Sequence, residues 1–135
     1  MKTGIWIDKE KAHLITLLDK EILLETIHSD IENFKPKGGS RSKVKWGPQD
    51  VVQDSKYTER EKHQFKKYFK KISERIGDAD AIAIFGPAGT NLKFAEELQK
   101  HYKRIAAKIK GVEKADSMTL NQTKALVKNY FEENT

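Results

Sequence analysis

The first 28 residues alternate short apolar runs with polar breaks. Residues 3–8, 12–18 and 21–28 are rich in isoleucine, leucine, threonine and aromatic side chains, and the polar segments 8–11 and 19–20 separate them. Apolar runs of this length with tight polar connections are typical of strands joined by hairpin turns. The pattern therefore predicts a three-stranded antiparallel meander.

Residues 29–57 show no clear period and are predicted to form a long basic loop, with a short strand or turn in its second half. A loop of this length is unusual in a compact domain unless it has a function. A helical pattern begins at Thr58, where Thr58 and Glu61 have the spacing of a capping box, and Gly77 is expected to end the helix. Its predicted core face consists of Phe65, Tyr68, Phe69, Ile72 and Ile76.

The second half of the chain reads as alternating strands and helices. The apolar run 80–85 is typical of a strand buried on both faces. The turn 86–91 leads into a helix, residues 104–112 are predicted as a further strand, and a second capping box at Thr119 and Gln122 begins the last helix. The expected core positions of these two helices are Leu92, Ala95, Leu98 and Tyr102, then Leu120, Thr123, Leu126, Val127, Tyr130 and Phe131.

The predicted element order is βββαβαβα, which places the chain in the α/β class. Three meandering strands followed by βα units predict a mixed sheet with helices on its faces, the ribonuclease H-like arrangement. A chain of 135 residues is expected to form one domain, 1–135, and to bury about two-thirds of its unfolded surface. The absence of cysteine excludes disulfides and thiolate chemistry.

Positive charge is concentrated in one segment. Residues 35–76 hold 13 Lys and Arg against 5 Asp and Glu, whereas the rest of the chain holds 13 against 15. Such a local field indicates an anionic partner such as RNA, although a lysine-rich helix face can also be a solvated surface. Trp46 can stack on an unpaired base or pack its loop onto the body. The candidate RNA-binding residues are Lys35, Lys37, Gly38, Gly39, Ser40, Arg41, Lys43, Lys45, Trp46, Lys62, Lys66 and Lys70.

The turn between the buried strand and the next helix is a second candidate site. Exposed amides at a helix start can hold a phosphate or carboxylate, and glycines allow close approach. The candidate residues are Gly86, Ala88, Gly89 and Thr90. The segment matches neither a Walker A nor a dinucleotide-binding motif, and the simpler interpretation is a tight turn whose glycines meet local dihedral needs.

A ribonuclease H-like order also raises a metal-dependent nuclease, in which carboxylates on adjacent strands hold divalent ions. Asp8 lies at the end of the first strand, whereas Asp80 lies at the beginning of its strand and Asp116 on a loop, so the three carboxylates are not expected to meet. The simpler interpretation of Asp8 is a residue at the corner of a hairpin. The histidines lack metal-ligand spacing. We therefore predict no metal, no cofactor and no catalytic residue set.

The distribution of apolar residues along the chain bears on where in the cell the protein is expected. No apolar run approaches the about 18–20 residues of a membrane span, and the N-terminus lacks a signal-peptide core. These features predict a cytoplasmic protein without a membrane partner. The basic segment predicts structured RNA as the partner, and no reader of a specific DNA sequence is expected. The oligomeric state is left open.

Three segments carry a family resemblance: "GIWID" near the start, "IFGPA" in the middle and "ADSMTLNQTKALVKNYF" at 115–131. In this order, around a glycine-bearing basic loop, they resemble the middle domain of eukaryotic and archaeal peptide-chain release factors and of Pelota. The resemblance is closer still to small bacterial relatives labelled translational machinery or host-attachment proteins. It implies the same fold, ribosome association and a bacterial source.

The release factors carry Gly-Gly-Gln in the loop after the meander, where the glutamine promotes peptidyl-tRNA hydrolysis. Here the matching region reads Gly38-Gly39-Ser40, and a hydroxyl cannot present the amide of glutamine. The preferred hypothesis is therefore a non-enzymatic ribosome- or RNA-binding module. The alternatives are a peptidyl-tRNA-hydrolysing rescue factor that uses the Gly-Gly-Ser loop, a divalent-metal nuclease centred on Asp8, and a protein-interaction domain with merely solubilising lysines.

Overall fold

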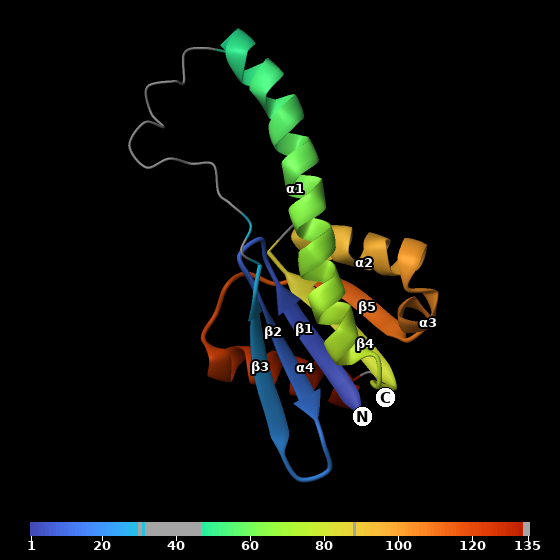
Figure 1. Ribbon diagram of the computed structural model, residues 1–135. Coiled ribbons are helices and arrows are strands. Elements are labelled where there is room, and N and C mark those ends of the chain that lie inside the picture. Colours follow the sequence, from blue (N-terminus) through green and yellow to red (C-terminus); the bar gives the residue numbers. More distant parts are fainter. Residues whose placement is uncertain (30, 32–46, 88, 134–135) are drawn as a thin grey trace.

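The computed structural model describes residues 1–29, 31, 47–87 and 89–133, and describes residues 47–58 by their backbone alone. Figure 1 shows one sheet with helices on both faces. The elements, in chain order, are β1 (Lys2–Ile7), β2 (Lys11–Leu17), β3 (Ile22–His28), α1 (Gly47–Ile76), β4 (Ala81–Gly86), α2 (Thr90–His101), α3 (Lys103–Ala106), β5 (Ile109–Lys114) and α4 (Leu120–Glu133).

The five strands form one open mixed sheet in the order β3-β2-β1-β4-β5. The strands β1, β2 and β3 pair antiparallel as a meander, whereas β4 and β5 run parallel to β1. This topology confirms the α/β class and the ribonuclease H-like mixed sheet. It also puts the central strand β1 between an antiparallel and a parallel neighbour, so both of its faces must be covered.

One face of the sheet packs against α1 and α2. Ile5 and Ile7 of β1 contribute to this side, because alternate residues of a strand point to the same face. The buried side chains that α1 contributes are Phe65, Tyr68, Phe69, Ile72 and Ile76, which confirms the predicted core face of this helix. On α2 the ring of Phe94 is fully buried and contacts Phe69, with 5.2 Å between ring centroids.

The opposite face packs against α4. Trp6 is buried here with Phe85, Val127 and Tyr130, and its indole Nε1–H donates a hydrogen bond of 3.0 Å to the Ala115 carbonyl. Trp6 is therefore a core residue of this face. Its indole also ties the sheet to the segment that leads into α4.

The beginning of α1 differs from the expectation. The helix starts at Gly47, so the predicted loop of 29–57 is too long, and Thr58 lies inside the helix rather than at its cap. Figure 1 shows the first turns of α1 extending beyond the sheet, where no core lies beneath them to require an apolar stripe. The signal that could have found this start is Pro48, because proline is favoured in the first turn of a helix.

Two smaller expectations also need correction. The predicted strand 104–112 is the short helix α3 followed by β5, which begins only at Ile109. The predicted core positions Leu92 and Leu120 are 60% and 43% exposed. On α2 the buried position belongs instead to Phe94, because the helix is rotated so that Phe94, Ala95 and Leu98 face the sheet.

The second capping box is confirmed. The backbone N–H of Gln122 donates to the Thr119 hydroxyl over 3.1 Å, and the Thr119 N–H donates to the Gln122 side-chain oxygen over 3.0 Å. Both donors would otherwise lack a partner at the start of α4. In the part of the chain that the structure describes, no helix has the length and apolar character needed to cross a membrane.

Candidate functional site

Three lysines form a row along the solvent side of α1. Lys62, Lys66 and Lys70 are exposed and follow one another at intervals of four residues, which places them on one side of a helix. We call these three residues the lysine row. The opposite side of the same turns is buried against the sheet, so the fold holds the row facing outward.

Several contacts fix α1 in this orientation. Lys9 Nζ lies 2.7 Å from Glu61 Oε2, and Lys71 Nζ donates to the His28 carbonyl over 3.0 Å. Arg75 forms a 3.4 Å ion pair with Glu25 of β3. Glu61, Lys71 and Arg75 of α1 are therefore engaged within the molecule. Among the described carboxylates, none forms an ion pair with the lysine row.

The spacing of the row opposes helix stability. Like charges at i and i+4 repel each other and destabilise a helix by about 0.2–0.5 kcal/mol per pair. The row contains two such pairs, Lys62 with Lys66 and Lys66 with Lys70. An anion that binds across the row would relieve this repulsion, so the arrangement is suited to contact with a polyanion.

A groove of about 320 Å³ runs between α1 and α2 beside the row. Its cationic lining residues are Lys62 and Lys66 from α1 and Lys93 and Lys100 from α2, and its acidic ones are Glu61, Glu96 and Glu97. The ammonium of Lys93 sits 4.8 Å from the ring centroid of Phe65, a cation–π contact that covers the apolar floor. Because Phe65 is only 7% exposed, the groove offers charge rather than an open aromatic surface for base stacking.

The α2 lysines were missed by the sequence analysis. Lys93 and Lys100 belong to a segment with no net basic character, and only the packing of α2 beside α1 brings them to the groove. No local sequence signal announces such a neighbour. Nine of the twelve predicted RNA-binding residues lie outside the described residues: Lys35, Lys37, Gly38, Gly39, Ser40, Arg41, Lys43, Lys45 and Trp46.

The candidate anion-binding turn follows β4. A Cβ on Gly86 would clash with the backbone carbonyl oxygen of Ile7 in β1 and would lie 3.0 Å from the Asn91 Cβ. This glycine is therefore needed for β4 to lie close to both β1 and the start of α2. Gly89 has a φ of +86°, which glycine adopts without strain, and nothing crowds it. Thr90 begins α2 and is 9% exposed, and Ala88 lies outside the described residues.

Asn91 completes the description of this turn. Its side-chain Nδ2 donates to the Glu113 carbonyl of β5 over 3.1 Å, while its buried Oδ1 accepts no hydrogen bond from the described residues. The side chain thus bridges the helix start and the edge strand. Both glycines have structural reasons to be glycine, and anion binding at the turn stays a prediction.

Asp8 serves the hairpin between β1 and β2. Its Oδ1 accepts the backbone N–H groups of Glu10 and Lys11 over 2.8 and 2.9 Å, which is the turn-forming role of aspartate. Among the described residues, no group of three or more histidine, aspartate or glutamate side chains is arranged to hold a metal ion.

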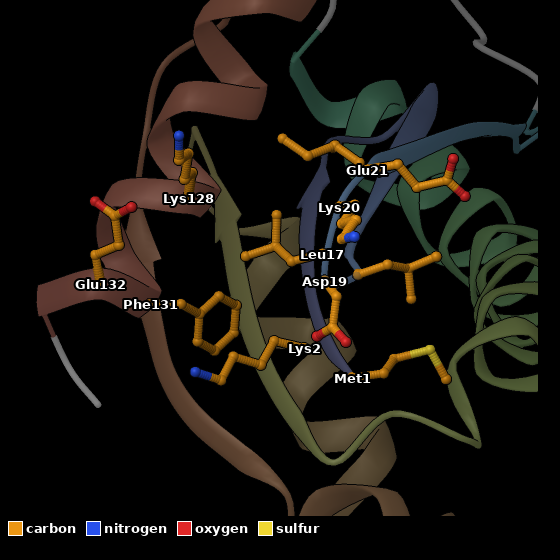
Figure 2. Close-up of a pocket in the computed structure, with 11 residues that line it drawn as sticks. Met1, Lys2, Leu17, Asp19, Lys20, Glu21, Lys128, Phe131 and Glu132 are labelled. Carbon is orange, nitrogen blue, oxygen red and sulfur yellow. The ribbon is translucent and has the colours of Figure 1, made fainter.

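A larger hollow of about 610 Å³ lies at the other end of the sheet. Figure 2 shows Phe131 and Lys128 of α4 on one side, with Leu17 and the β2–β3 turn residues Asp19, Lys20 and Glu21 on the other. Its lining mixes apolar side chains with both signs of charge. None of the predicted site residues lies in it.

The comparisons with known proteins support the fold. The chain is similar to the crystal structure of the archaeal translation termination factor aRF1, with a TM-score of 0.56, 13% sequence identity and 98% of the chain covered. It is also similar to a structure described as an archaeal protein, with a TM-score of 0.55, 11% identity and 96% covered. No family model matches the chain, and no curated protein matches it in sequence.

These likenesses concern a part of longer proteins. The chain spans 39% of the aRF1 structure and 33% of the second one. At such low identity they define the class of fold, that of a translation termination factor domain, and leave the activity of those whole proteins to proposals. The bacterial relatives expected from the sequence are not among these structures.

Proposed function

We propose that this protein is a non-enzymatic binding module that associates with the ribosome or with structured RNA through its basic segment, residues 35–76. The observation that carries the proposal is the lysine row, three exposed lysines that repel their neighbours in the row and face outward on a helix. Glu61, Lys71 and Arg75 of the same helix are instead engaged within the molecule. RNA supplies closely spaced phosphates that fit such a row.

Two further observations support this reading. The surplus of positive charge is confined to residues 35–76, while the rest of the chain carries a slight acidic excess. The fold is similar to that of an archaeal translation termination factor, a protein that by its name acts in translation. In this proposal the residues from Lys35 to Trp46 extend the contact that the lysine row begins.

The test is co-sedimentation with purified ribosomes over a range of salt concentrations. Six to eight engaged cations would give a slope of log affinity against log salt of about −5 to −7. Replacing Lys62, Lys66 and Lys70 with glutamine should flatten this slope by about 2–3 and weaken binding at every salt concentration.

The matched control removes the same charge elsewhere. Lys103, Lys110 and Lys128 are exposed lysines outside the basic segment, and their change to glutamine should leave the slope near that of the wild type. If both triple variants lost ribosome binding equally, the loss would be explained by net charge alone, and the lysine row would be rejected as a site. Peptide release from stalled ribosomes that disappears in Gly39→Ala would instead support the hydrolysing alternative.

A further inference from the structure

Strand β3 forms one edge of the sheet (Figure 1) and is unusually apolar for such a position. Its seven residues, Ile22–His28, include Ile22 and Leu23, whose side chains are 37% and 48% exposed. An edge strand presents unpaired backbone N–H and C=O groups, so an apolar one invites pairing with another strand.

The backbone groups that point outward can be assigned. Just outside the two ends of β3, the Leu18 N–H donates to the Glu21 carbonyl over 2.9 Å and the Ser29 N–H donates to the Glu10 carbonyl over 2.8 Å. Hydrogen-bonded pairs occur at every second residue of an antiparallel ladder, so the odd-numbered residues of β3 are the ones that exchange hydrogen bonds with β2. The N–H and C=O groups of Ile22, Leu24, Thr26 and His28 therefore point away from the sheet. The His28 carbonyl agrees, since it accepts from Lys71 Nζ.

The opposite edge of the sheet is built differently. Strand β5 carries Lys110, Glu113 and Lys114, and its register with β4 shifts between Ile82 and Ala83. Charged side chains and irregular register are the features that block unwanted pairing at an edge. The ladder of β3 with β2 runs without a shift, and β3 contains no proline or lysine. Among the described strands, β3 is therefore the edge that lacks such protection.

We propose that β3 pairs antiparallel with β3 of a second copy of this chain, with the two-fold axis passing Leu24. In a symmetric pair, outward-pointing residues must face outward-pointing residues. With Leu24 on the axis, Leu24 faces its own copy, Ile22 faces Thr26, and Leu23 faces Glu25. All outward N–H and C=O groups from Ile22 to Thr26 then have partners, and no two like charges are opposed.

The other symmetric registers are poorer. An axis at Glu25 sets the two Glu25 carboxylates against each other, and an axis at Leu23 sets Glu21 against Glu25, which is destabilising across strands. With the axis at Thr26, Leu24 of one copy faces His28 of the other, and the His28 carbonyl would have to accept the Leu24 N–H. That carbonyl already accepts a hydrogen bond from Lys71. Leu24 is therefore the centre that the strand itself favours.

Apolar burial supports a second copy as the occupant. The side chains of Ile22 and Leu24 lie on the α4 face of the sheet, where Ile22 borders the hollow lined by Leu17 and Phe131 (Figure 2). Across the axis the same stripe of the second copy continues this apolar surface. Pairing thus removes from water part of the apolar surface of Ile22 and Leu24 in both copies.

Sedimentation analysis over a dilution series tests the proposal. The wild type should shift with rising concentration from the 15.5 kDa of one chain to twice that mass. Leu24→Lys places two ammonium groups at the axis and should weaken dimerisation at least about tenfold. Leu23→Lys, on the more exposed neighbour, brings a lysine opposite Glu25 of the second copy and should leave the dimer intact or tighter.

A measurement on the unaltered protein guards against misfolding of the variants. In the dimer the backbone amides of Leu24 and Thr26 should exchange slowly and become fast on dilution, whereas the amides of Leu23 and Glu25, bonded to β2, should change little. A wild type that stays monomeric at all concentrations overturns the proposal. So does equal dissociation by both lysine variants, which would indicate unspecific apolar contact. The outcome is independent of RNA binding.

Discussion

The hydroxyl of Tyr68 donates a hydrogen bond of 3.0 Å to the backbone carbonyl of Asp8, which ties α1 to the turn between β1 and β2. Tyr68 is fully buried. Burial and, secondarily, the charge of Asp8 raise the pKa of the Tyr68 phenol, so the group remains a protonated donor. This contact holds the helix of the lysine row in register with the sheet.

Tyr68→Phe removes that hydrogen bond and keeps the ring. We expect the free energy of unfolding, measured by urea denaturation, to fall by about 0.5–1.5 kcal/mol. Tyr102→Phe is the control, because the Tyr102 hydroxyl makes no hydrogen bond with the described residues, and its effect should be near zero. Equal losses in the two variants would mean that the Asp8 contact contributes nothing of its own.

At Gly4, α4 approaches the sheet closely. A Cβ at this position would lie 2.9 Å from the Cβ of Val127 and closer to its methyl groups. Gly4→Ala should therefore lower stability by about 1–3 kcal/mol through overpacking. In a protein that already carries Val127→Ala, Gly4→Ala should cause a smaller loss of stability, because the clashing methyl groups are absent.

Gly77→Ala is the matched control for Gly4→Ala. Only the Ser73 carbonyl, at 3.9 Å, lies near its added Cβ, so the change should be neutral or slightly stabilising. Additive effects of Gly4→Ala and Val127→Ala in a double-mutant cycle would contradict the proposed clash.

The capping box of α4 gives a third prediction. Thr119→Ala removes the oxygen that accepts the Gln122 N–H and should lower the free energy of unfolding by about 1 kcal/mol in thermal or urea denaturation. Thr119→Ser retains the hydroxyl and should stay close to the wild type. If Thr119→Ser lowered the free energy of unfolding as much as Thr119→Ala, the lost stability would come from the threonine methyl group and not from the hydroxyl.

His13 makes stability depend on pH. Burial is the main cause that lowers the pKa of its imidazole from 6.5, followed by Lys11, with His28 lowering it further and Asp8 opposing. The unfolded chain then binds more protons at this histidine than the folded one, so the free energy of unfolding should fall as the pH drops below about 6.5.

The measurement compares the wild type with His13→Gln. At about pH 8 the imidazole is neutral in both states, and the two proteins differ only by lost contacts such as the 2.9 Å hydrogen bond between His13 Nδ1 and Thr26 Oγ1. Toward about pH 5 the wild type should lose stability faster than the variant. Parallel pH profiles would show that His13 titrates alike in the folded and unfolded chain.

The elements that the sequence predicted well are those whose pattern reports local burial. The three meander strands and β4 are short apolar runs bounded by polar or turn residues, and the apolar stripe from Phe65 to Ile76 repeats with the period of a helix. The Thr119–Gln122 box is local as well, since its two hydrogen bonds join residues three positions apart. Such signals do not depend on the rest of the chain.

The errors arose where tertiary surroundings decide. The first turns of α1 have no sheet beneath them and therefore no apolar period, so the helix was predicted to begin eleven residues late, at Thr58 instead of Gly47. Leu92 was expected in the core, but the docking angle of α2 buries Phe94 in its place. Helical spacing defines a face, and packing against a particular neighbour selects which face is covered.

The sequence by itself determined the element order apart from the short helix α3, the mixed-sheet fold class and the concentration of positive charge in residues 35–76, because these follow from local periodicity and composition. Only the tertiary structure decided which lysines of α1 remain unpaired by described carboxylates, and that Lys93 and Lys100 of α2 join Lys62 at one groove. It alone showed that β3 is an edge strand of the described sheet and exposes apolar side chains. Contacts between residues distant in the chain depend on how helices dock on the sheet, and no local pattern encodes that geometry.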